Sequence, residues 1–214
     1  MPLTSRTCAA HALAERLSAH RGRNSLVLGL PRGPVEMASV IARELDGDLD
    51  VILVRPVLAG SLPGAIHATV CESGEIAINS PSRTAAVTEE ILAQVILQAL
   101  VDLVQERALH TPFSFPADPH GRTVILVADG VARGYCLQAA VQAIRSREPA
   151  RLIVALAAAP GPVVNRLRAL ADEVVCLEVT SGLAAVGRTC RDWRRVSEGD
   201  GIAILQMAKA EHVA

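Results

Sequence analysis

The hydrophobic pattern of the chain alternates between two kinds of segment. Short continuous apolar runs are typical of buried strands, whereas apolar residues that recur every third or fourth position are typical of a helix with one buried face. Residues 67–79 contain two short strand-like pieces around Ser73 and Gly74. Elsewhere we predict strands at 25–30, 50–55, 123–128, 151–157 and 173–178, and helices at 5–20, 33–45, 88–109, 134–147, 162–171 and 199–210.

This order of elements predicts the fold class. Apolar strands that alternate with helices form a mostly parallel sheet with helices on both faces, which is an α/β architecture. Ligands of such sheets bind beyond the carboxyl ends of the strands. For 214 residues we expect a single domain, 1–214, in which 80–121 is a helical insertion and 180–214 is a C-terminal extension.

Two segments rich in proline and glycine interrupt the pattern. The first, 56–64, follows a predicted strand, and we expect residues 56–67 to form a lid over a ligand site. The second, 112–121, is expected to be a surface connection.

The predicted helix at 88–109 is apolar over most of its surface. Gln94, Gln98, Asp102 and Gln105 form one narrow polar stripe along it. So narrow a stripe indicates burial on most sides. A homodimer interface and packing against the sheet are two explanations that the sequence leaves open.

Composition excludes several classes of function. A net charge of -1 and an aromatic content of 2% argue against a basic nucleic-acid binder and against stacking platforms for single strands. Five cysteines, without short paired spacing or a nearby histidine cluster, favour reduced thiols over disulfides or a zinc site. There is neither a secretory signal pattern nor an apolar run of the roughly 18 residues that cross a bilayer. We therefore expect a cytoplasmic protein that binds neither nucleic acid nor membrane.

The segment VILVADGVARGYCLQAAVQAI, residues 124–144, contains the strongest candidate for a ligand site. A buried strand ends at Asp129, and a loop bracketed by Gly130 and Gly134 leads into a helix. The first amides of a helix lack intrahelical partners and its N-terminal end is positive, so such a loop attracts phosphate. Asp129 could hold sugar hydroxyls or reach a bound cation. An ordinary strand-to-helix turn is the alternative explanation.

The loop GLPRG at 29–33 also joins a predicted strand to a predicted helix. Arg32 could direct its charge and the neighbouring amide groups, such as that of Gly33, at a diphosphate, or it could lie in solvent. Arg55 ends the next strand on the same predicted edge of the sheet. It is either a second phosphate contact or an exposed arginine at a strand end.

In these segments the chain resembles the type I phosphoribosyltransferases. The order of apolar residues, acidic residue, small-residue loop and helix at 124–144 is similar to the fingerprint of that family. The resemblance covers nearly the whole chain. Further segments are similar to successive landmarks of one bacterial subgroup, namely LVLGLPRGPVEMASVIAREL (26–45), LDVILVRP (49–56), ESGEIAIN (72–79) and AAVGRTCRDW (184–193).

The resemblance implies a substrate and a role for particular residues. It implies binding of phosphoribosyl pyrophosphate (PRPP), ribose 5-phosphate or a nucleotide, and transfer of the phosphoribosyl group to an acceptor such as a nucleobase. Asp129 would be the catalytic, ribose-binding carboxylate, and Arg32, Gly33 and Arg55 would contact pyrophosphate. Mg²⁺ would enter with PRPP, without direct protein ligands. The 5-phosphate would be held by Gly130, Val131, Ala132, Arg133, Gly134, Tyr135 and Cys136.

The chain departs from the family pattern at positions that bear on activity. Ala128 stands where the family has the first of two carboxylates, and Pro56 stands where the subgroup commonly has a lysine. Arg133 and Cys136 replace threonines, and Tyr135 replaces a small residue. Arg133 could bind an anion by charge-assisted hydrogen bonds or fill the pocket with its own bulk. Two functions stay open, a working phosphoribosyltransferase and a non-catalytic sugar-phosphate-binding or regulatory protein that kept the fold.

Four arginines surround the only tryptophan, Trp193, near the C-terminal end. We expect this cluster to be a solvated, partly self-paired surface, and a patch for a nucleotide or an acidic partner is the alternative. With so few aromatic residues, a base-binding pocket would depend on Tyr135, Trp193 or aliphatic walls. The cluster consists of Arg188, Arg191, Arg194 and Arg195.

Overall fold

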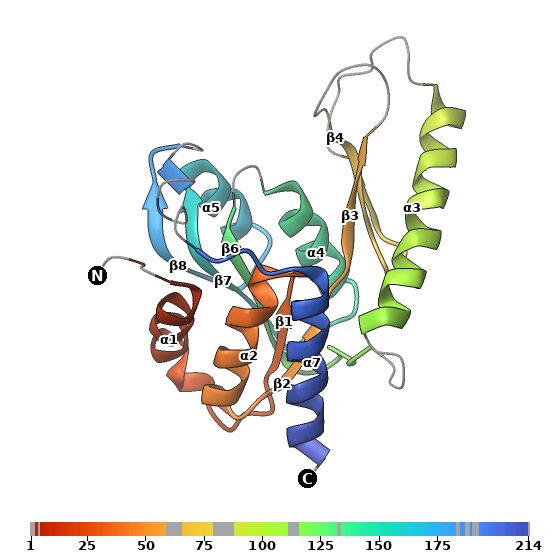
Figure 1. The fold of residues 1–214 in the computed structure, drawn as a ribbon. Coiled ribbons are helices and arrows are strands. Elements are labelled where there is room, and N and C mark those ends of the chain that lie inside the picture. The colour runs from red at the N-terminus through yellow and green to blue at the C-terminus, as the bar shows by residue number, and fades with distance from the viewer. Residues whose placement is uncertain are drawn as a thin grey trace.

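A five-stranded parallel sheet forms the centre of the computed structural model (Figure 1). Its order is β2-β1-β6-β7-β8, and every neighbouring pair is in parallel register. This arrangement confirms the expected α/β fold. The strands are β1 (Leu26–Gly29), β2 (Asp48–Val51), β6 (Thr123–Gly130), β7 (Arg151–Pro160) and β8 (Glu173–Thr180). The structure describes residue 3 and residues 5–58, 66–78, 88–110, 116–131, 134–182, 185–186, 189 and 193–213.

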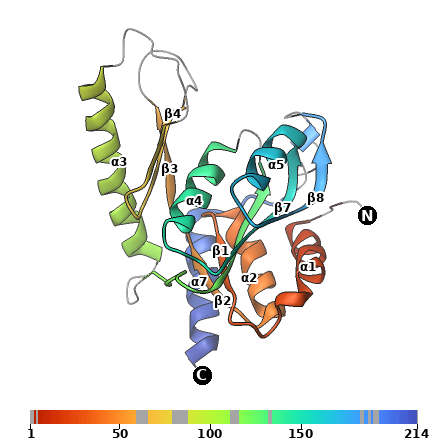
Figure 2. The ribbon, with the colours of Figure 1, turned by 180° about the vertical axis from the view of Figure 1, so that it is seen from behind.

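Helices cover both faces of this sheet, and Figure 2 shows the layers from behind. On one face, α1 (Arg6–Arg16) and α2 (Gly33–Leu45) pack on the strands, and α7 (Glu198–Val213) contacts α2 and β2. On the other face lie α4 (Tyr135–Arg145) and α5 (Gly161–Arg168). A short 3-10 turn, η1 (Ser18–His20), follows α1.

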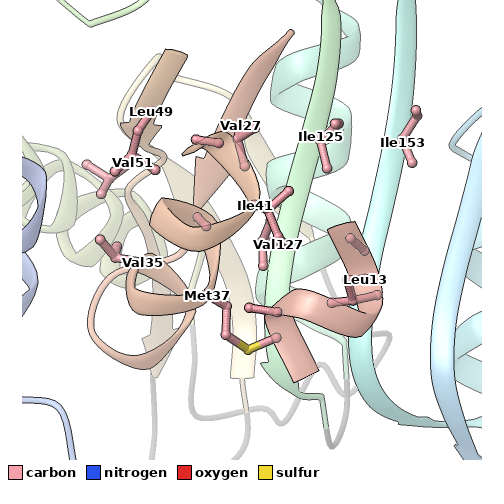
Figure 3. Close-up of a cluster of buried hydrophobic side chains, with 14 of the residues drawn as sticks. Leu13, Val27, Val35, Met37, Ile41, Leu49, Val51, Ile125, Val127 and Ile153 are labelled. Carbon is pink, nitrogen blue, oxygen red and sulfur yellow. The ribbon is translucent and has the colours of Figure 1, made fainter. Parts of the chain in front are cut away.

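Two clusters of buried apolar side chains hold these layers together. Successive strand residues point to opposite faces, so Val27 and Ile125 pack toward α1 and α2, whereas Leu26 and Val124 pack toward α4 and α5. Figure 3 shows the first cluster, where Met37 of α2 lies among the strand side chains and those of α1. Burial on both faces explains why the strands are continuous apolar runs in the sequence.

A second, antiparallel sheet and a long helix form an arm beside the core (Figure 1). The sheet has the order β3-β4-β5, and α3 packs on β3 and β4. The single strand predicted at 50–55 is therefore wrong, because β2 ends in the parallel sheet and β3 begins in the antiparallel one. The arm consists of β3 (Val54–Leu58), β4 (Ile66–Cys71), β5 (Ile76–Ile78) and α3 (Glu89–His110).

The polar stripe of α3 does not reflect burial on most sides. Within this helix the buried residues are Ala99, Leu103 and His110. Apolar side chains elsewhere on the helix, including Leu97 and Val104, are exposed. The helix packs mainly on strands β3 and β4 of the arm, and Asp102 and Gln105 of its stripe border a cleft.

Both proline- and glycine-rich segments lie partly outside the described residues. Residues 59–65 of the expected lid and residues 111–115 before and within the expected connection are not among them. The described part of the connection is attached to β2, because the Ala117 amide donates to Asp50 Oδ2 at 2.8 Å. In the described parts of the chain, the helices are too short or too polar to span a bilayer.

Candidate functional site

A cleft of about 660 Å³ lies between the carboxyl edge of the parallel sheet and α3. Ligands of parallel sheets bind at this edge, which makes the cleft the candidate site. The loop after β1, the start of β3, the starts of α4 and α7, and one side of α3 all contribute to it. Its lining residues are Leu30, Pro31, Arg32, Val54, Arg55, Pro56, Asp102, Gln105, Glu106, Leu109, Cys136 and Glu198.

Arg32 lines the cleft in an unusual backbone conformation. Its φ of 72° and ψ of -121° correspond to the first central position of a type II′ turn, which glycine normally occupies. In a residue with a side chain, such a conformation costs roughly 1–3 kcal/mol and tends to be kept at functional sites. Arg32 directly precedes α2, whose first turn receives no side-chain cap. The loop thus brings one guanidinium and an uncapped helix start to the same place.

The loop after β6 also leads into a helix whose first turn receives no side-chain cap. Gly134 is the N-cap of α4 with a φ of 82°, and no side chain bonds to the first turn. A Cβ built on Gly134 would lie 2.9 Å from Cγ1 of Val163, so backbone angle and packing both require glycine. The amides that begin at Tyr135 lack intrahelical acceptors, and Cys136 lines the cleft.

Part of the predicted phosphate loop is already hydrogen-bonded within the chain. The Gly130 amide donates to Asp129 Oδ1 at 2.8 Å, and the Val131 amide donates to the Ala158 carbonyl at 3.0 Å. Ala132 and Arg133 lie outside the described residues. Among the described residues, the amides that remain for an anion are therefore those at the start of α4.

Asp129 forms an ion pair that was not predicted from the sequence. Its Oδ2 accepts a hydrogen bond from Arg6 Nε at 3.1 Å, and the side chains of Arg6 and Asp129 are only 14% and 25% exposed. Gly33 lies against this pair. A Cβ built on Gly33 would be 2.5 Å from Arg6 Nε and 2.6 Å from Asp129 Oδ2. Glycine at this position thus leaves room for the guanidinium and the carboxylate to meet at the start of α2.

Both ends of the chain hold Arg6 in place. Its guanidinium carbon lies 5.3 Å from the centre of the Trp193 ring, and Nη1 donates to the Arg194 carbonyl. Trp193 in turn donates from Nε1 to the Leu3 carbonyl at 3.1 Å. Trp193 therefore supports Arg6 and is not an exposed member of an arginine patch. Arg188 and Arg191 of that predicted cluster lie outside the described residues.

Arg55 reaches the cleft in the company of two acidic residues of α3. Its guanidinium bonds to Glu106 Oε2 at 2.7 Å and to Asp102 Oδ2 at 3.4 Å. Glu198 lines the same cleft, so its two arginines, Arg32 and Arg55, face three carboxylates. A bound diphosphate would compete with α3 for Arg55.

The Cys136 thiol is not set up as a nucleophile. Burial raises the pKa of this thiol above its ordinary value, and a backbone hydrogen bond offsets only part of the effect. The thiol therefore stays protonated at neutral pH, where thiolates are the reactive form of cysteine. Cys136 can shape the cleft beside an anion without adding negative charge.

Comparison with known proteins decides the family. The family model described as the phosphoribosyl transferase domain matches residues 6–190, which is most of the chain. The chain belongs to the phosphoribosyltransferase family. This confirms the resemblance drawn from the loops at 29–33 and 124–144.

Individual relatives agree with this assignment. The Mycobacterium tuberculosis proteins named "Putative phosphoribosyl transferase Rv0571c" and "Putative phosphoribosyl transferase MT0597" are each 32% identical over 202 residues. The match covers 94% of this chain but 45% of each relative, so the chain spans about half the length of the curated relatives it matches. The crystal structure of TT1426 from Thermus thermophilus has 35% identity and a TM-score of 0.80, and the match covers 97% of this chain and 99% of that one.

The phosphoribosyltransferase fold gathers most of the predicted residues at one edge. Arg32, Arg55 and Cys136 line the cleft, whereas Asp129 and Gly33 meet next to it through Arg6. Neither the role of Arg6 nor the wall that α3 supplies was predicted from the sequence. The local signal of Arg6 is slight: it is a basic residue at the first position of a helix that has no acidic residue in its first turn.

Two further polar groups near the predicted loops were also missed. Glu36 Oε2, in the first turn of α2, and Gln138 Nε2, one turn into α4, are buried without a hydrogen-bond partner among the described residues. A buried unpaired polar atom in a native structure calls for an explanation, and a ligand is one. No pattern in the sequence distinguishes these two residues from ordinary helix positions.

A smaller cavity of about 210 Å³ lies at the junction of the arm and the core. Its lining is mostly apolar. Of its charged residues, Arg107 is bonded to both Asp50 and Glu72, and Arg147 pairs with Asp118. It contains none of the predicted site residues that the structure describes. This cavity therefore has the character of a packing defect beside an ion network and is not the candidate site.

Proposed function

We propose that the protein binds PRPP in the cleft and transfers its phosphoribosyl group to an acceptor, most simply a nucleobase. The observation that carries the proposal is the convergence of two uncapped helix starts, those of α2 and α4, at one cleft. Each start offers amide donors and the positive end of a helix dipole to an anion. PRPP has two anionic ends, a 5-phosphate and a diphosphate, which match two such starts.

The proposed roles follow from position. The start of α4, from Gly134 to Cys136, holds the 5-phosphate, and the loop with Arg32 and Gly33 holds the diphosphate. Asp129 lies between them and orients the ribose hydroxyls. As the bond from sugar C1 to the diphosphate breaks, positive charge develops on the ring, and holding the leaving group and excluding water are the main demands on the protein. Arg55 contacts the diphosphate once that group displaces it from Glu106.

Mg²⁺ commonly accompanies PRPP in the resembling family, where it neutralises the diphosphate. Among the described residues there is no group of three or more His, Cys, Asp or Glu side chains that could hold an ion by themselves. Asp129 already accepts one hydrogen bond on each oxygen, from the Gly130 amide and from Arg6, and its charge is paired with that of Arg6. We propose that any Mg²⁺ enters on the phosphate oxygens of PRPP alone.

A second candidate function is a sugar-phosphate-binding protein without catalysis. The ion pair between Arg6 and Asp129 favours it, because that carboxylate is already bonded and Ala128 offers no replacement. In this candidate the same cleft binds ribose 5-phosphate or a nucleotide as a signal. The two candidates share the binding site and differ in turnover.

Calorimetry with PRPP, followed by a pyrophosphate-release assay over candidate bases, tests and separates these functions. Turnover that is lost in Asp129→Asn but kept in Asp118→Asn, a control in an exposed loop, supports the transferase. Tight binding without turnover for any base supports the binding protein. The absence of binding to PRPP, ribose 5-phosphate and nucleotides would contradict both.

We also propose that a second copy of the chain covers the exposed apolar face of α3. Leu97, Val101 and Val104 recur at helical spacing and are exposed, as are Ile76 and Ile78 of β5 in the same arm. Several exposed apolar side chains on one helix face are typical of an interaction site. A homodimer would bury it without obstructing the side of α3 that lines the cleft.

A cytoplasmic role in nucleotide metabolism belongs to the same proposal. Among the described residues, Cys71, Cys136 and Cys176 are free thiols in the structure. Free thiols are the usual state in a reducing compartment.

A further inference from the structure

Each oxygen of the carboxylate that the resemblance assigns to the ribose already accepts one hydrogen bond within the chain, and its charge is paired with a guanidinium. Asp129 Oδ1 accepts from the Gly130 amide at 2.8 Å, and Oδ2 accepts from Arg6 Nε at 3.1 Å. The residue before it, Ala128, has a buried apolar side chain at the position where the family has the other carboxylate of the pair. Divalent cations such as Mg²⁺ need several oxygen ligands in a fixed geometry. A cation at Asp129 would lie beside the positive charge of the Arg6 guanidinium, which is 14% exposed.

Arg6 is fixed in position before any ligand arrives. Its side chain is 14% exposed, lies over the ring of Trp193 and donates to the Arg194 carbonyl. Residues from the two ends of the chain thus hold it against the edge of the central sheet. A guanidinium held in this way loses little conformational freedom on binding an anion.

Arg6 lies next to the candidate cleft. It touches Gly33, the first residue of α2, and so adjoins the loop of Arg32 that lines the cleft. A guanidinium has five N–H donors. Among the described residues, Arg6 has acceptors for Nε and Nη1, but none is found for Nη2. Arg6 can therefore keep Asp129 and donate to an oxygen of the phosphorylated sugar with its remaining donors.

We propose that Arg6 supplies the positive charge that a divalent cation would otherwise bring to Asp129, so that the protein binds the phosphorylated sugar without a metal ion of its own. This inference rests on the proposed function. Arg6 then acts as a ligand-binding residue, and Ala128 is compatible with binding because no second carboxylate is needed to hold a metal.

The test is calorimetric titration with ribose 5-phosphate, once in EDTA and once in Mg²⁺. It uses the wild type, Arg6→Gln, Arg6→Lys and the control Arg16→Gln, which removes an exposed arginine from the other end of α1. Circular dichroism checks that each variant is folded. The fluorescence of Trp193, the only tryptophan, gives a second readout at the position of Arg6.

We expect the wild type and Arg16→Gln to bind with the same affinity, within about twofold, in EDTA and in Mg²⁺. Arg6→Gln should bind about tenfold or more weakly in EDTA, since a charge-assisted hydrogen bond is lost, and Mg²⁺ should recover part of the loss. Arg6→Lys keeps the charge and should stay independent of Mg²⁺, which preserves the test if Arg6→Gln does not fold.

Three results would overturn the inference while leaving the proposed function intact. In the first, the wild type binds ribose 5-phosphate only with Mg²⁺. In the second, Arg6→Gln binds as tightly as the wild type or more tightly. In the third, Arg6→Gln loses affinity for ribose 5-phosphate and Mg²⁺ does not change that loss. The second result would mean that Arg6 blocks the site, and the third that its role is structural. If the wild type binds no ribose 5-phosphate under either condition, the proposed function fails and the inference fails with it.

Discussion

Arg107, near the end of α3, is the residue whose replacement should most weaken the attachment of the arm to the core. Its guanidinium donates to Asp50 Oδ1 at 3.2 Å, to the Val51 carbonyl at 2.7 Å and to both carboxylate oxygens of Glu72. The side chains of Arg107, Asp50 and Glu72 are 12%, 1% and 13% exposed. Water therefore cannot replace these bonds if the arginine is removed.

Arg107→Met keeps most of the aliphatic stem and removes the charge. Breaking a buried ion pair from one side costs about 3–5 kcal/mol, because the remaining carboxylate stays buried without its partner. Asp50 still accepts from the Val51 and Ala117 amides at 2.8 Å each, which offsets part of this cost. We therefore expect the free energy of unfolding to fall by about 3 kcal/mol, at the lower end of that range.

Arg55→Met is the matched control for this prediction. Arg55 also pairs with carboxylates of α3, but Arg55, Asp102 and Glu106 are 37%, 37% and 20% exposed. Partly solvated pairs contribute about 1 kcal/mol or less. Urea unfolding at pH 7, followed by circular dichroism and by the fluorescence of Trp193, measures both variants. A loss below about 1 kcal/mol for Arg107→Met, or equal losses for the two variants, would show that burial of the Arg107 network does not stabilise the arm.

Three further changes test separate parts of the structure. Gly134→Ala should lower the free energy of unfolding by about 1–3 kcal/mol, because the backbone there is left-handed and the new methyl group would contact Val163. Gly182→Ala is the control, since Gly182 has open space around it and a φ outside the left-handed region, and it should change the stability little. Thermal melts compare the two variants. Burial alone would raise the pKa of Asp172, but hydrogen bonds from Arg145 and the Leu152 amide outweigh it and lower the pKa. The ionised form of Asp172 therefore stabilises the fold, so Asp172→Asn should be less stable than the wild type at pH 7. This difference in stability should vanish as the pH falls below about 4, where the wild-type carboxyl group becomes protonated. Equal stability of the two proteins at pH 7 would contradict this prediction. Leu97→Glu should convert a dimer into a monomer in light scattering after gel filtration, and an unchanged mass would argue against the proposed interface.

Local periodicity was sufficient to predict nearly every helix and strand. Strand and helix signals depend on neighbours a few residues away, and those neighbours are visible in the sequence. The exception is 50–55, where one apolar run contains the end of one strand and the start of another. Ile52 and Leu53 between them are buried, so hydrophobicity gives no sign of the boundary. Membership of a sheet depends on hydrogen-bond partners far along the chain, which periodicity does not report.

The two loops of the candidate site were predictable because glycine and helix-start chemistry are local. The partner of Asp129 was not predictable in this way, since Arg6 is 123 positions away in the chain. A hint existed in the positive charge at the start of α1, which opposes the helix dipole. Local conflicts of this kind are expected where a residue serves a site elsewhere in the fold.

The polar stripe of α3 was recognised correctly, but the burial inferred from it is absent within the single chain, and the homodimer explanation stays a prediction. Asp102, Gln105 and Glu106 border the cleft, and the helix is exposed on much of its remaining surface. A narrow stripe indicates that two sides of a helix differ, but it does not say whether the polar side meets solvent, a ligand or a partner.

A crystal structure with bound PRPP would decide whether the cleft binds a phosphorylated ribose between the starts of α2 and α4. We expect the 5-phosphate at the amides of Tyr135 and Cys136, the diphosphate at Arg32, and Arg6 still bonded to Asp129. Density for PRPP in another place, or a cleft that its own side chains fill in the presence of saturating ligand, would show that these helix starts are not the binding site.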